Sequence, residues 1–335
     1  MQDSLGRQID YLRLSLTGRC NLACIYCRGG AGDTEWPDAG EPGGGQDGEL
    51  SMGEIKRIIP CTTALGIRKV RLTGGEPLLR EDLEEIVAYL GSVPEIQDLA
   101  MTTNGQGLAR RAAALKKAGL GRVNISLDSL KPGVYREITR GGDLEETLAG
   151  VRAALAWGLE PVKLNCVILK GRNDGEAGAF IALAREQPLH VRFIELMPFR
   201  TAAGIASAGM TSAEILETHG ELRRLEPETG PVETAYAGKG FRGTVGFISP
   251  ISQPFCRNCN RIRITADGKL KTCLGHNREL DLRSLLTGPD TALRSAVAES
   301  AIAKSAIAEE IARKPGGHHF GEGFVSQRTM DRIGG

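Results

Sequence analysis

The stretch RCNLACIYC (residues 19–27) places Cys20, Cys24 and Cys27 at the spacing C-x3-C-x2-C. It follows residues 9–16, where apolar and polar side chains alternate as in a half-buried β-strand. Three thiolates can bind three irons of a 4Fe–4S cubane and leave the fourth iron open to a small molecule. The alternative is a zinc knuckle without its fourth ligand, although structural zinc sites favour paired cysteines and closed tetrahedra.

Strand-like and helix-like patterns alternate downstream of this first cysteine group. The strand candidates are residues 9–16, 69–73, 99–103, 122–127, 162–169 and 191–196. The helix candidates are residues 52–59, 81–90, 107–118, 144–157 and 177–186. Ser51, with Glu54 three residues later, predicts a capping box for the first helix. Six βα units in succession predict a parallel sheet, either open or curled into a barrel.

The pattern changes after about residue 200, which predicts two regions, residues 1–220 and 221–335. Short β-like runs occupy residues 222–225, 244–248, 262–265 and 270–273, and Asp267-Gly268 indicates a hairpin between the last two. An alanine-rich helix is expected over residues 290–313. Residues 29–48 are rich in glycine and predict a mobile loop.

The composition excludes several classes of protein. The 335 residues include 42 Lys plus Arg and 41 Asp plus Glu, a formal net charge of +1. A basic surface that binds nucleic acid or an anionic membrane is therefore not expected. No apolar run is long enough to span a bilayer, and the N-terminus has no apolar signal core, so we expect a cytoplasmic protein.

Eight cysteines in such a compartment indicate metal or iron–sulfur ligation rather than disulfides. The second cysteine group, Cys256, Cys259 and Cys273, has the spacing C-x2-C-x13-C and fits another cluster with three protein ligands. Zinc with His276 as fourth ligand, or a disulfide, are the alternatives. Cys61 and Cys166 stand alone and are expected in the core.

Arg261 and Arg263 follow the second cysteine group on a strand-like run, so both side chains should point to one face. Two guanidinium groups on one face form a clamp suited to phosphates. The alternative is a solvated pair of surface charges.

The stretch of residues 19–27 resembles the signature of the radical S-adenosylmethionine (SAM) superfamily. That resemblance implies that the first cysteine group binds a 4Fe–4S cluster whose open iron is chelated by SAM. Reductive cleavage of SAM then gives a 5′-deoxyadenosyl radical. In TGGEP (residues 73–77), two glycines permit close approach to a ligand, and Glu76 can accept from an ammonium. The implied SAM contacts are Tyr26, Gly75, Ser126 and Met197.

Further stretches resemble one family within that superfamily, the GTP 3′,8-cyclases of molybdenum cofactor biosynthesis. They are YLRLS (11–15), VRLTGGEP (70–77), TTNG (102–105), NISLD (124–128), FCRNCNRIR (255–263), GHHF (317–320) and the Gly334-Gly335 terminus. The family fold is an α/β incomplete (β/α)6 TIM-like barrel with a C-terminal β-rich region and a terminal helix. The chain departs from the family at Arg28-Gly29-Gly30 and in the glycine-rich loop that follows.

The family resemblance implies conversion of GTP to (8S)-3′,8-cyclo-7,8-dihydroguanosine 5′-triphosphate, with a second 4Fe–4S cluster that binds the guanine. The implied GTP contacts are Arg13, Arg71, Thr102, Lys163, Arg261, Ile262 and Arg263. The implied catalytic residues are Arg13, Arg261, Arg263, Gly334 and Gly335. The implied partners are an external electron donor, the downstream cyclic pyranopterin monophosphate synthase and a second copy of the chain.

Two other functions remain open on the sequence alone. A radical SAM enzyme with an auxiliary cluster that modifies a peptide would also carry cysteines near its C-terminus. A non-catalytic zinc-ribbon scaffold would use the same cysteines for zinc. The Arg261–Arg263 clamp favours a nucleotide over a peptide.

Overall fold

The computed structural model describes residues 1–27, 48–199, 209–226, 232–287, 296–320 and 324–334. The predicted glycine-rich loop and Gly335 therefore lie outside the described residues, except for Gly48. Among the described residues, no helix is both long and apolar enough to cross a membrane.

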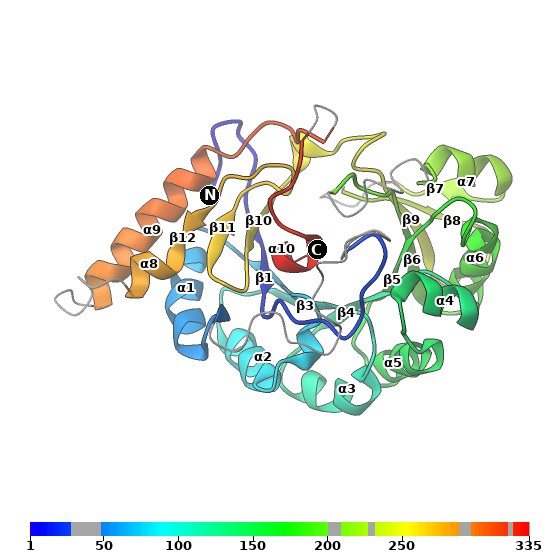
Figure 1. The fold of residues 1–335 in the computed structure, drawn as a ribbon, viewed down its shortest axis with the longest axis horizontal. Coiled ribbons are helices and arrows are strands. Elements are labelled where there is room, and N and C mark those ends of the chain that lie inside the picture. Colours follow the sequence, from blue (N-terminus) through cyan, green and yellow to red (C-terminus); the bar gives the residue numbers. More distant parts are fainter. Residues whose placement is uncertain (28–47, 200–208, 227–231, 288–295, 321–323, 335) are drawn as a thin grey trace.

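The six predicted strands are present and pair in parallel in the order of the chain (Figure 1). They are β1 (Tyr11–Ser15), β2 (Lys69–Thr73), β3 (Asp98–Thr103), β4 (Arg122–Ser126), β5 (Val162–Val167) and β6 (Leu189–Ile194). Because parallel neighbours need a crossover connection, helices link them. The linking helices are α1 (Met52–Ala64), α2 (Leu83–Ser92), α3 (Leu108–Lys117), α4 (Pro132–Thr139), α5 (Leu144–Ala156) and α6 (Ala177–Glu186).

Strands of the C-terminal region extend both edges of this sheet. β10 (Arg261–Ile264) pairs in parallel with β1, and β9 (Thr244–Ile248) pairs in parallel with β6. The described sheet runs in the order β12-β11-β10-β1-β2-β3-β4-β5-β6-β9-β8-β7 and does not close on itself. The predicted incomplete barrel is thereby confirmed. The boundary at residue 220 stays a prediction, and strands from both sides of it share one sheet.

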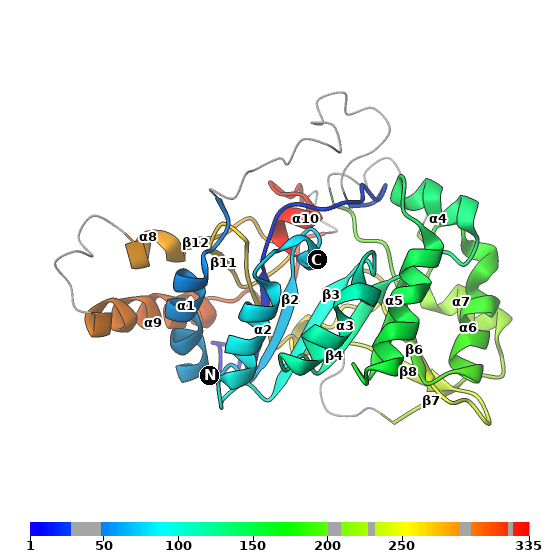
Figure 2. The same cartoon turned by 90° about the horizontal axis from the view of Figure 1, so that it is seen from below.

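The four outer strands are short and antiparallel, and two of them overlap the predicted β-like runs. They are β7 (Arg223–Arg224), β8 (Thr234–Ala237), β11 (Lys269–Lys271) and β12 (Leu280–Asp281). The remaining helices are α7 (Ser212–Thr218), α8 (Leu282–Thr287), α9 (Ala296–Ala312) and α10 (Met330–Ile333). α9 lies beside α1 on the outside, whereas α10 enters the space enclosed by the curved sheet (Figures 1 and 2).

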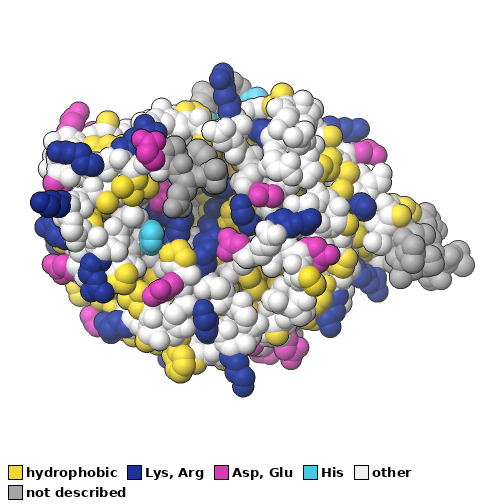
Figure 3. Space-filling view, turned by 180° about the vertical axis from the view of Figure 1, so that it is seen from behind, with side chains coloured by type: hydrophobic (Ala, Val, Ile, Leu, Met, Phe, Trp, Pro, Cys, Tyr) yellow, Lys and Arg dark blue, Asp and Glu magenta, His cyan; other side chains and the backbone are white. Residues whose placement is uncertain are grey.

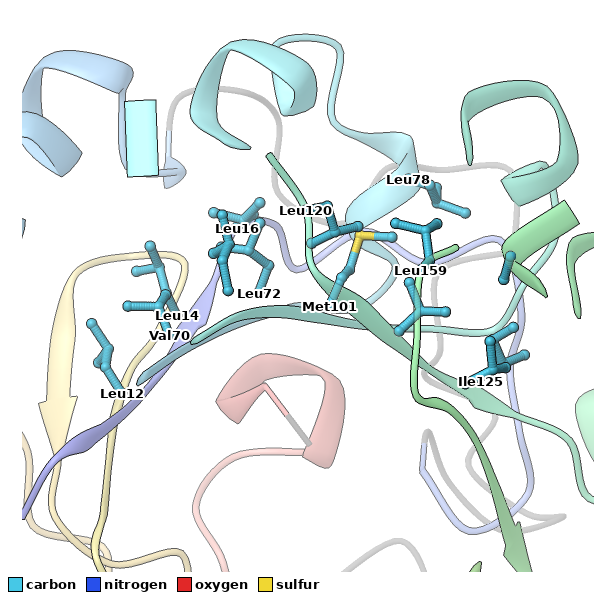
Figure 4. Close-up of a cluster of buried hydrophobic side chains, with 14 of the residues drawn as sticks. Leu12, Leu14, Leu16, Val70, Leu72, Leu78, Met101, Leu120, Ile125 and Leu159 are labelled. Atoms are coloured by element: carbon cyan, nitrogen blue, oxygen red, sulfur yellow. The ribbon is translucent and has the colours of Figure 1, made fainter. Parts of the chain in front are cut away.

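The core lies between the sheet and the ring of helices. In β1, Leu12 and Leu14 are 0% and 1% exposed and point toward the helices, with Leu16 just beyond the strand (Figure 4). Side chains alternate along a strand, so Tyr11, Arg13 and Ser15 face the other way, into the barrel. Cys61 and Cys166 are buried in this core, as predicted.

Candidate active site

One cavity in the barrel interior, of about 310 Å³, brings both cysteine groups together. The predicted site residues that line it are Arg13, Cys20, Cys24, Tyr26, Cys27, Arg71, Gly75, Thr102, Ser126, Met197, Cys256, Cys259, Arg261, Arg263 and Cys273. From behind, the molecule has a hollow in which Lys and Arg side chains gather (Figure 3). Residues separated by more than two hundred positions in the sequence thus share one chamber.

The strand register explains why the arginines converge. Arg13 in β1 is paired with Arg71 in β2 on one side and with Arg263 in β10 on the other. Arg261, two residues before Arg263, faces the same way. Among the described residues, no carboxylate forms an ion pair with any of these four side chains. The expectation that Arg261 and Arg263 share a face is confirmed.

These crowded cations raise the free energy of the ligand-free site. Burial, followed by the charges of Arg263 and Arg261, lowers the pKa of Arg13 well below its ordinary value. Burial lowers the pKa of Arg71 to about 9 and that of Arg263 to about 10. A bound polyanion would relieve both the desolvation and the mutual repulsion.

Buried polar atoms without partners mark the same wall of the cavity. The Nε atoms of Arg13, Arg71 and Arg261 have no hydrogen-bond partner, and neither do the hydroxyls of Ser15 and Thr73. Buried polar groups in folded proteins are nearly always satisfied, so these donors indicate the seat of a polar ligand.

On β5 and β6 the inward cations have a protein counter-charge instead. The Nε of Arg192 lies 2.9 Å from the Oε2 of Glu233, and the Nζ of Lys163 lies 4.0 Å from the same oxygen. Gly246 makes room for this carboxylate, because a Cβ there would lie 2.2 Å from the Oε1 of Glu233. Burial and then Arg192 lower the pKa of Lys163 to about 8, against the opposing effect of Glu233.

Arg192 and Glu233 were not predicted from the sequence. The available signal for Arg192 was a cation between the apolar residues Val191 and Phe193 of a strand. Lys163, a predicted GTP contact, is placed beside Glu233 rather than on the cavity wall.

The first cysteine group lies in the loop after β1, and Cys20, Cys24 and Cys27 are free cysteines that line the cavity. Tyr26 donates a hydrogen bond from its hydroxyl to the Oδ2 of Asp128, at 2.6 Å. Asp128 also accepts from the backbone N–H of Val167 at 2.8 Å, and burial raises its pKa to about 6. The carboxylate therefore fixes the Tyr26 ring at the end of β4.

The glycines of the TGGEP stretch pack against the loop that carries the first cysteine group. A Cβ on Gly75 would lie 2.1 Å from the carbonyl oxygen of Arg19, and the N–H of Gly75 donates to Thr17 at 2.7 Å. The backbone of Arg19 therefore leaves no room for a side chain at position 75. Gly75 is also one of the residues that line the cavity.

Glu76 lines the cavity, and its role as an acceptor for an ammonium stays a prediction. Its carboxylate accepts from the hydroxyl of Thr103 at 2.7 Å, from the N–H of Asn104 at 2.6 Å and from the N–H of Leu78 at 3.0 Å. Burial raises its pKa to about 7. The side chain therefore braces the loops after β2 and β3, and its Oε2, which accepts one of these hydrogen bonds, can accept another.

Ile262, a predicted GTP contact, presents no side chain to the cavity. Its side chain is fully buried in the outer core, since it alternates with the inward-facing Arg261 and Arg263. Only its backbone can meet a ligand. Gly334 follows α10 with φ +78°, and the Nη1 of Arg263 donates to its carbonyl at 3.5 Å. A Cβ on Gly334 would lie 2.5 Å from the Oγ1 of Thr73, so the tail threads closely between β1, β2 and β10.

The second cysteine group lines the opposite part of the cavity, from the short helix Cys256–Asn258 and the end of β11. His276 is not placed as a ligand, because its Nε2 is hydrogen-bonded to the carbonyl of Gly317 at 3.1 Å. Three thiols facing one cavity, in each group, fit an iron–sulfur cluster with an open iron. Within the described ranges, no three His, Cys, Asp or Glu side chains converge as ligands of one metal ion would.

The family models match the two halves of the chain in turn. Residues 14–184 match the model "Radical SAM superfamily", and residues 189–320 match "Molybdenum Cofactor Synthesis C". The chain is 44% identical to the GTP 3′,8-cyclase of Moorella thermoacetica and 44% identical to that of Pelotomaculum thermopropionicum, each over the full length of both chains. It is 41% identical to the GTP 3′,8-cyclase of Alkaliphilus metalliredigens, again over both full lengths.

Solved structures agree on the fold. The crystal structure of Streptococcus suis SuiB bound to S-adenosylmethionine superposes with a TM-score of 0.55 at 14% identity, covering 88% of this chain and 68% of that chain. The match to full-length relatives is far closer than this likeness of fold. The chain therefore belongs to the radical SAM superfamily and, within it, to the family of the GTP 3′,8-cyclases.

Proposed function

We infer that this chain is a lyase that converts GTP to (8S)-3′,8-cyclo-7,8-dihydroguanosine 5′-triphosphate, the first step of molybdenum cofactor biosynthesis. One observation carries this inference beyond the family. A single cavity holds both cysteine groups and four inward arginines that lack carboxylate partners within the described residues. A triphosphate supplies the negative charge that this wall lacks.

The cofactors are two 4Fe–4S clusters and SAM. Cys20, Cys24 and Cys27 would hold the first cluster, and Cys256, Cys259 and Cys273 the second. When bound, they supply the hydrogen-abstracting radical and an iron site for the guanine, and the protein supplies position and charge.

Tyr26, Gly75, Ser126 and Met197 form the proposed SAM side of the cavity, at the carboxyl ends of the strands. Sites on parallel α/β sheets lie at these ends because the connecting loops converge there. Asp128 orients Tyr26 through the 2.6 Å hydrogen bond. The orientation of this ring is thus set before SAM binds.

Arg13, Arg71, Arg261 and Arg263 form the proposed triphosphate side, with Thr102 and Lys163 at its margin. Arg13, Arg71 and Arg261 each keep an unpartnered Nε donor for phosphate oxygens, and the barrel wall excludes water from these pairs. Arg13 and Arg263 also place positive charge beside the purine, which favours its reduction during ring closure. Gly334 and Gly335 are proposed to complete the catalytic site, because the tail narrows the cavity beside Thr73.

The proposed function also implies partner proteins and a cellular compartment. An external electron donor reduces the enzyme, and a cyclic pyranopterin monophosphate synthase takes the product. The chain works in the cytoplasm and can associate with a second copy of itself. These statements are supported by family membership.

The decisive test is anaerobic turnover. The reduced protein, incubated with SAM and GTP, is expected to form 5′-deoxyadenosine together with a cyclised guanine product, and iron and sulfide assays should give about eight irons per chain. Absence of GTP-dependent deoxyadenosine would refute the cyclase. Zinc without sulfide would refute every function that depends on radical SAM chemistry.

A peptide substrate is the competing candidate. Streptococcus suis SuiB, whose structure bound to the precursor peptide SuiA superposes with a TM-score of 0.53, is only 14% identical, so it supports the fold alone. The buried arginine wall favours the nucleotide, because a neutral peptide would leave those charges desolvated and uncompensated.

A further inference from the structure

Two buried cations outside the cavity hold the second cysteine group from behind. Arg7 comes from the N-terminal segment, and Lys314 comes from the segment after α9. Both are nearly inaccessible, with 8% and 3% of their surface exposed. Neither is among the described residues that line the cavity, so neither is placed to touch substrate.

Lys314 ties together the two chain segments that carry Cys259 and Cys273. Its Nζ donates to the carbonyl of Arg261 at 2.8 Å and to the carbonyl of Thr272. Arg261 is two residues after Cys259, and Thr272 immediately precedes Cys273. The single ammonium therefore spans β10 and the end of β11 at the cysteines.

Arg7 connects the third cysteine to the same point. Its Nη1 donates to the carbonyl of Cys256 at 2.9 Å, and its Nη2 donates to the carbonyls of Lys314 at 3.1 Å and Pro315 at 2.8 Å. All three cysteine-bearing segments are thus linked through Arg7 and Lys314, although they come from distant parts of the sequence.

The two cations differ in charge balance. The Nε of Arg7 lies 2.6 Å from the Oδ2 of Asp3, and that pair is buried and neutral overall. For Lys314, in the part of the chain that the structure describes, no carboxylate lies within ion-pair distance. It lies instead against the backbone beside Cys259 and Cys273, through the carbonyls of Arg261 and Thr272.

An uncompensated buried charge is costly unless something nearby neutralises it. A cluster held by three thiolates carries net negative charge, and that charge increases on reduction. The reduction potential of an iron–sulfur cluster depends on nearby charge and on hydrogen bonds around its ligands.

We propose that Lys314 is a positioning residue for the second cluster: it braces the Cys259 and Cys273 segments and supplies the buried positive charge that makes this cluster easier to reduce. The inference depends on the second cysteine group holding a cluster and is independent of which substrate binds there.

The test uses full-length protein in which Cys20, Cys24 and Cys27 are replaced by alanine, so that only the second cluster is present. Three variants separate the two roles of Lys314. K314R keeps the charge, K314Q keeps a donor without the charge, and K314M removes both. Iron content and a potentiometric titration followed by electron paramagnetic resonance are the readouts.

K314Q is expected to keep its iron and to show about a tenfold smaller ratio of reduced to oxidised cluster at a fixed applied potential. For one electron, this corresponds to a reduction potential lower by about 59 mV. K314R should stay close to the parent protein. K314M should lose iron in addition, because the carbonyls of Arg261 and Thr272 lose their shared donor.

Lys271 provides the matched control. It is also buried, at 2%, but its Nζ is paired with the Oε1 of Glu279 at 3.1 Å, and Arg328 would still neutralise Glu279 in K271M. K271M should keep its iron and shift the potential less than K314Q does. A second control places K314Q in protein lacking Cys256, Cys259 and Cys273, where the first cluster should titrate unchanged.

Two results would overturn the proposal. The first is that K314Q and K314M both retain iron and that their ratios of reduced to oxidised cluster stay within threefold of the parent protein's ratio. The other is an equal loss or shift for the first cluster, which would mean general destabilisation. If the parent protein with only the second cysteine group binds no iron, the proposed second cluster itself fails, and that outcome is read before any Lys314 variant.

Discussion

Replacing Gly334 by alanine should expel the C-terminal tail from the barrel. Gly334 has φ +78°, a region in which a residue with a Cβ costs about 1–2 kcal/mol. The added Cβ would also lie 2.5 Å from the Oγ1 of Thr73 and 3.0 Å from the Cβ of Ser15. Backbone strain alone lowers the inserted population by about 5- to 30-fold, and the clash with two strand residues adds to it.

The helix α10, which carries Gly334 at its end, has only four residues, and packing of Ile333 and Met330 opposes the change. We therefore expect the rate of GTP cyclisation to fall at least fivefold at saturating GTP, while iron content stays at the wild-type level. The assay is anaerobic turnover, with cyclised product and 5′-deoxyadenosine measured in the same sample. The ratio of product to deoxyadenosine should fall, because the tail acts on the substrate side of the cavity.

Gly171 supplies a matched control. It has φ +75°, and nothing lies within 4 Å of the Cβ that alanine would add. G171A therefore carries the same backbone strain at a position outside the cavity and should cyclise GTP normally. If G334A cyclises GTP as fast as G171A, the tail has no role in the reaction and this reasoning fails.

Other predictions concern charge and metal. Arg71→Met should raise the KM for GTP roughly 10- to 100-fold, the loss of one charge-assisted hydrogen bond, and an unchanged KM would contradict the proposed triphosphate site. GTP binding should weaken as the pH rises through about 8, because Lys163 then loses its proton. Glu233→Gln should tighten GTP binding several-fold below pH 7, because it releases Lys163 and Arg192, and should tighten it less above pH 8. Equilibrium dialysis across pH measures this affinity. Weaker GTP binding in this variant would mean that Glu233 mainly orients the two cations. Cys27→Ala should halve the iron content and abolish deoxyadenosine formation, which iron assay and chromatography would check.

Most strands of the barrel could be predicted because they have a local alternation of apolar and polar residues, whereas β3 has the continuous apolar run Leu99-Ala100-Met101. α4 was missed because Pro132-Gly133 resembles a break, whereas proline is well tolerated in the first turn of a helix. β8 and β12 were also not predicted. Pairing of β9 and β10 with the outer strands of the barrel is long-range, so no local pattern could show it.

The residues of the site divide in the same way, into those with a local sequence pattern and those brought together by long-range pairing. Cysteine spacing and the alternation of Arg261 and Arg263 are local features, and the structure places all of these residues on one cavity. The pairing of Arg192 with Glu233 crosses the sheet and has no sequence signature. Ile262 shows that a residue between two ligand-facing positions on a strand lies in the core on the opposite face.

The most direct test of the central claim follows a single hydrogen atom. Reduced wild-type protein is incubated with SAM and GTP that carries deuterium at C3′ only, and the 5′-deoxyadenosine is analysed by mass spectrometry. The account predicts that deoxyadenosine forms with one deuterium and that its amount matches the cyclised product. Deoxyadenosine that stays unlabelled, or that forms at the same rate without GTP, would contradict the claim that this cavity binds GTP for hydrogen abstraction.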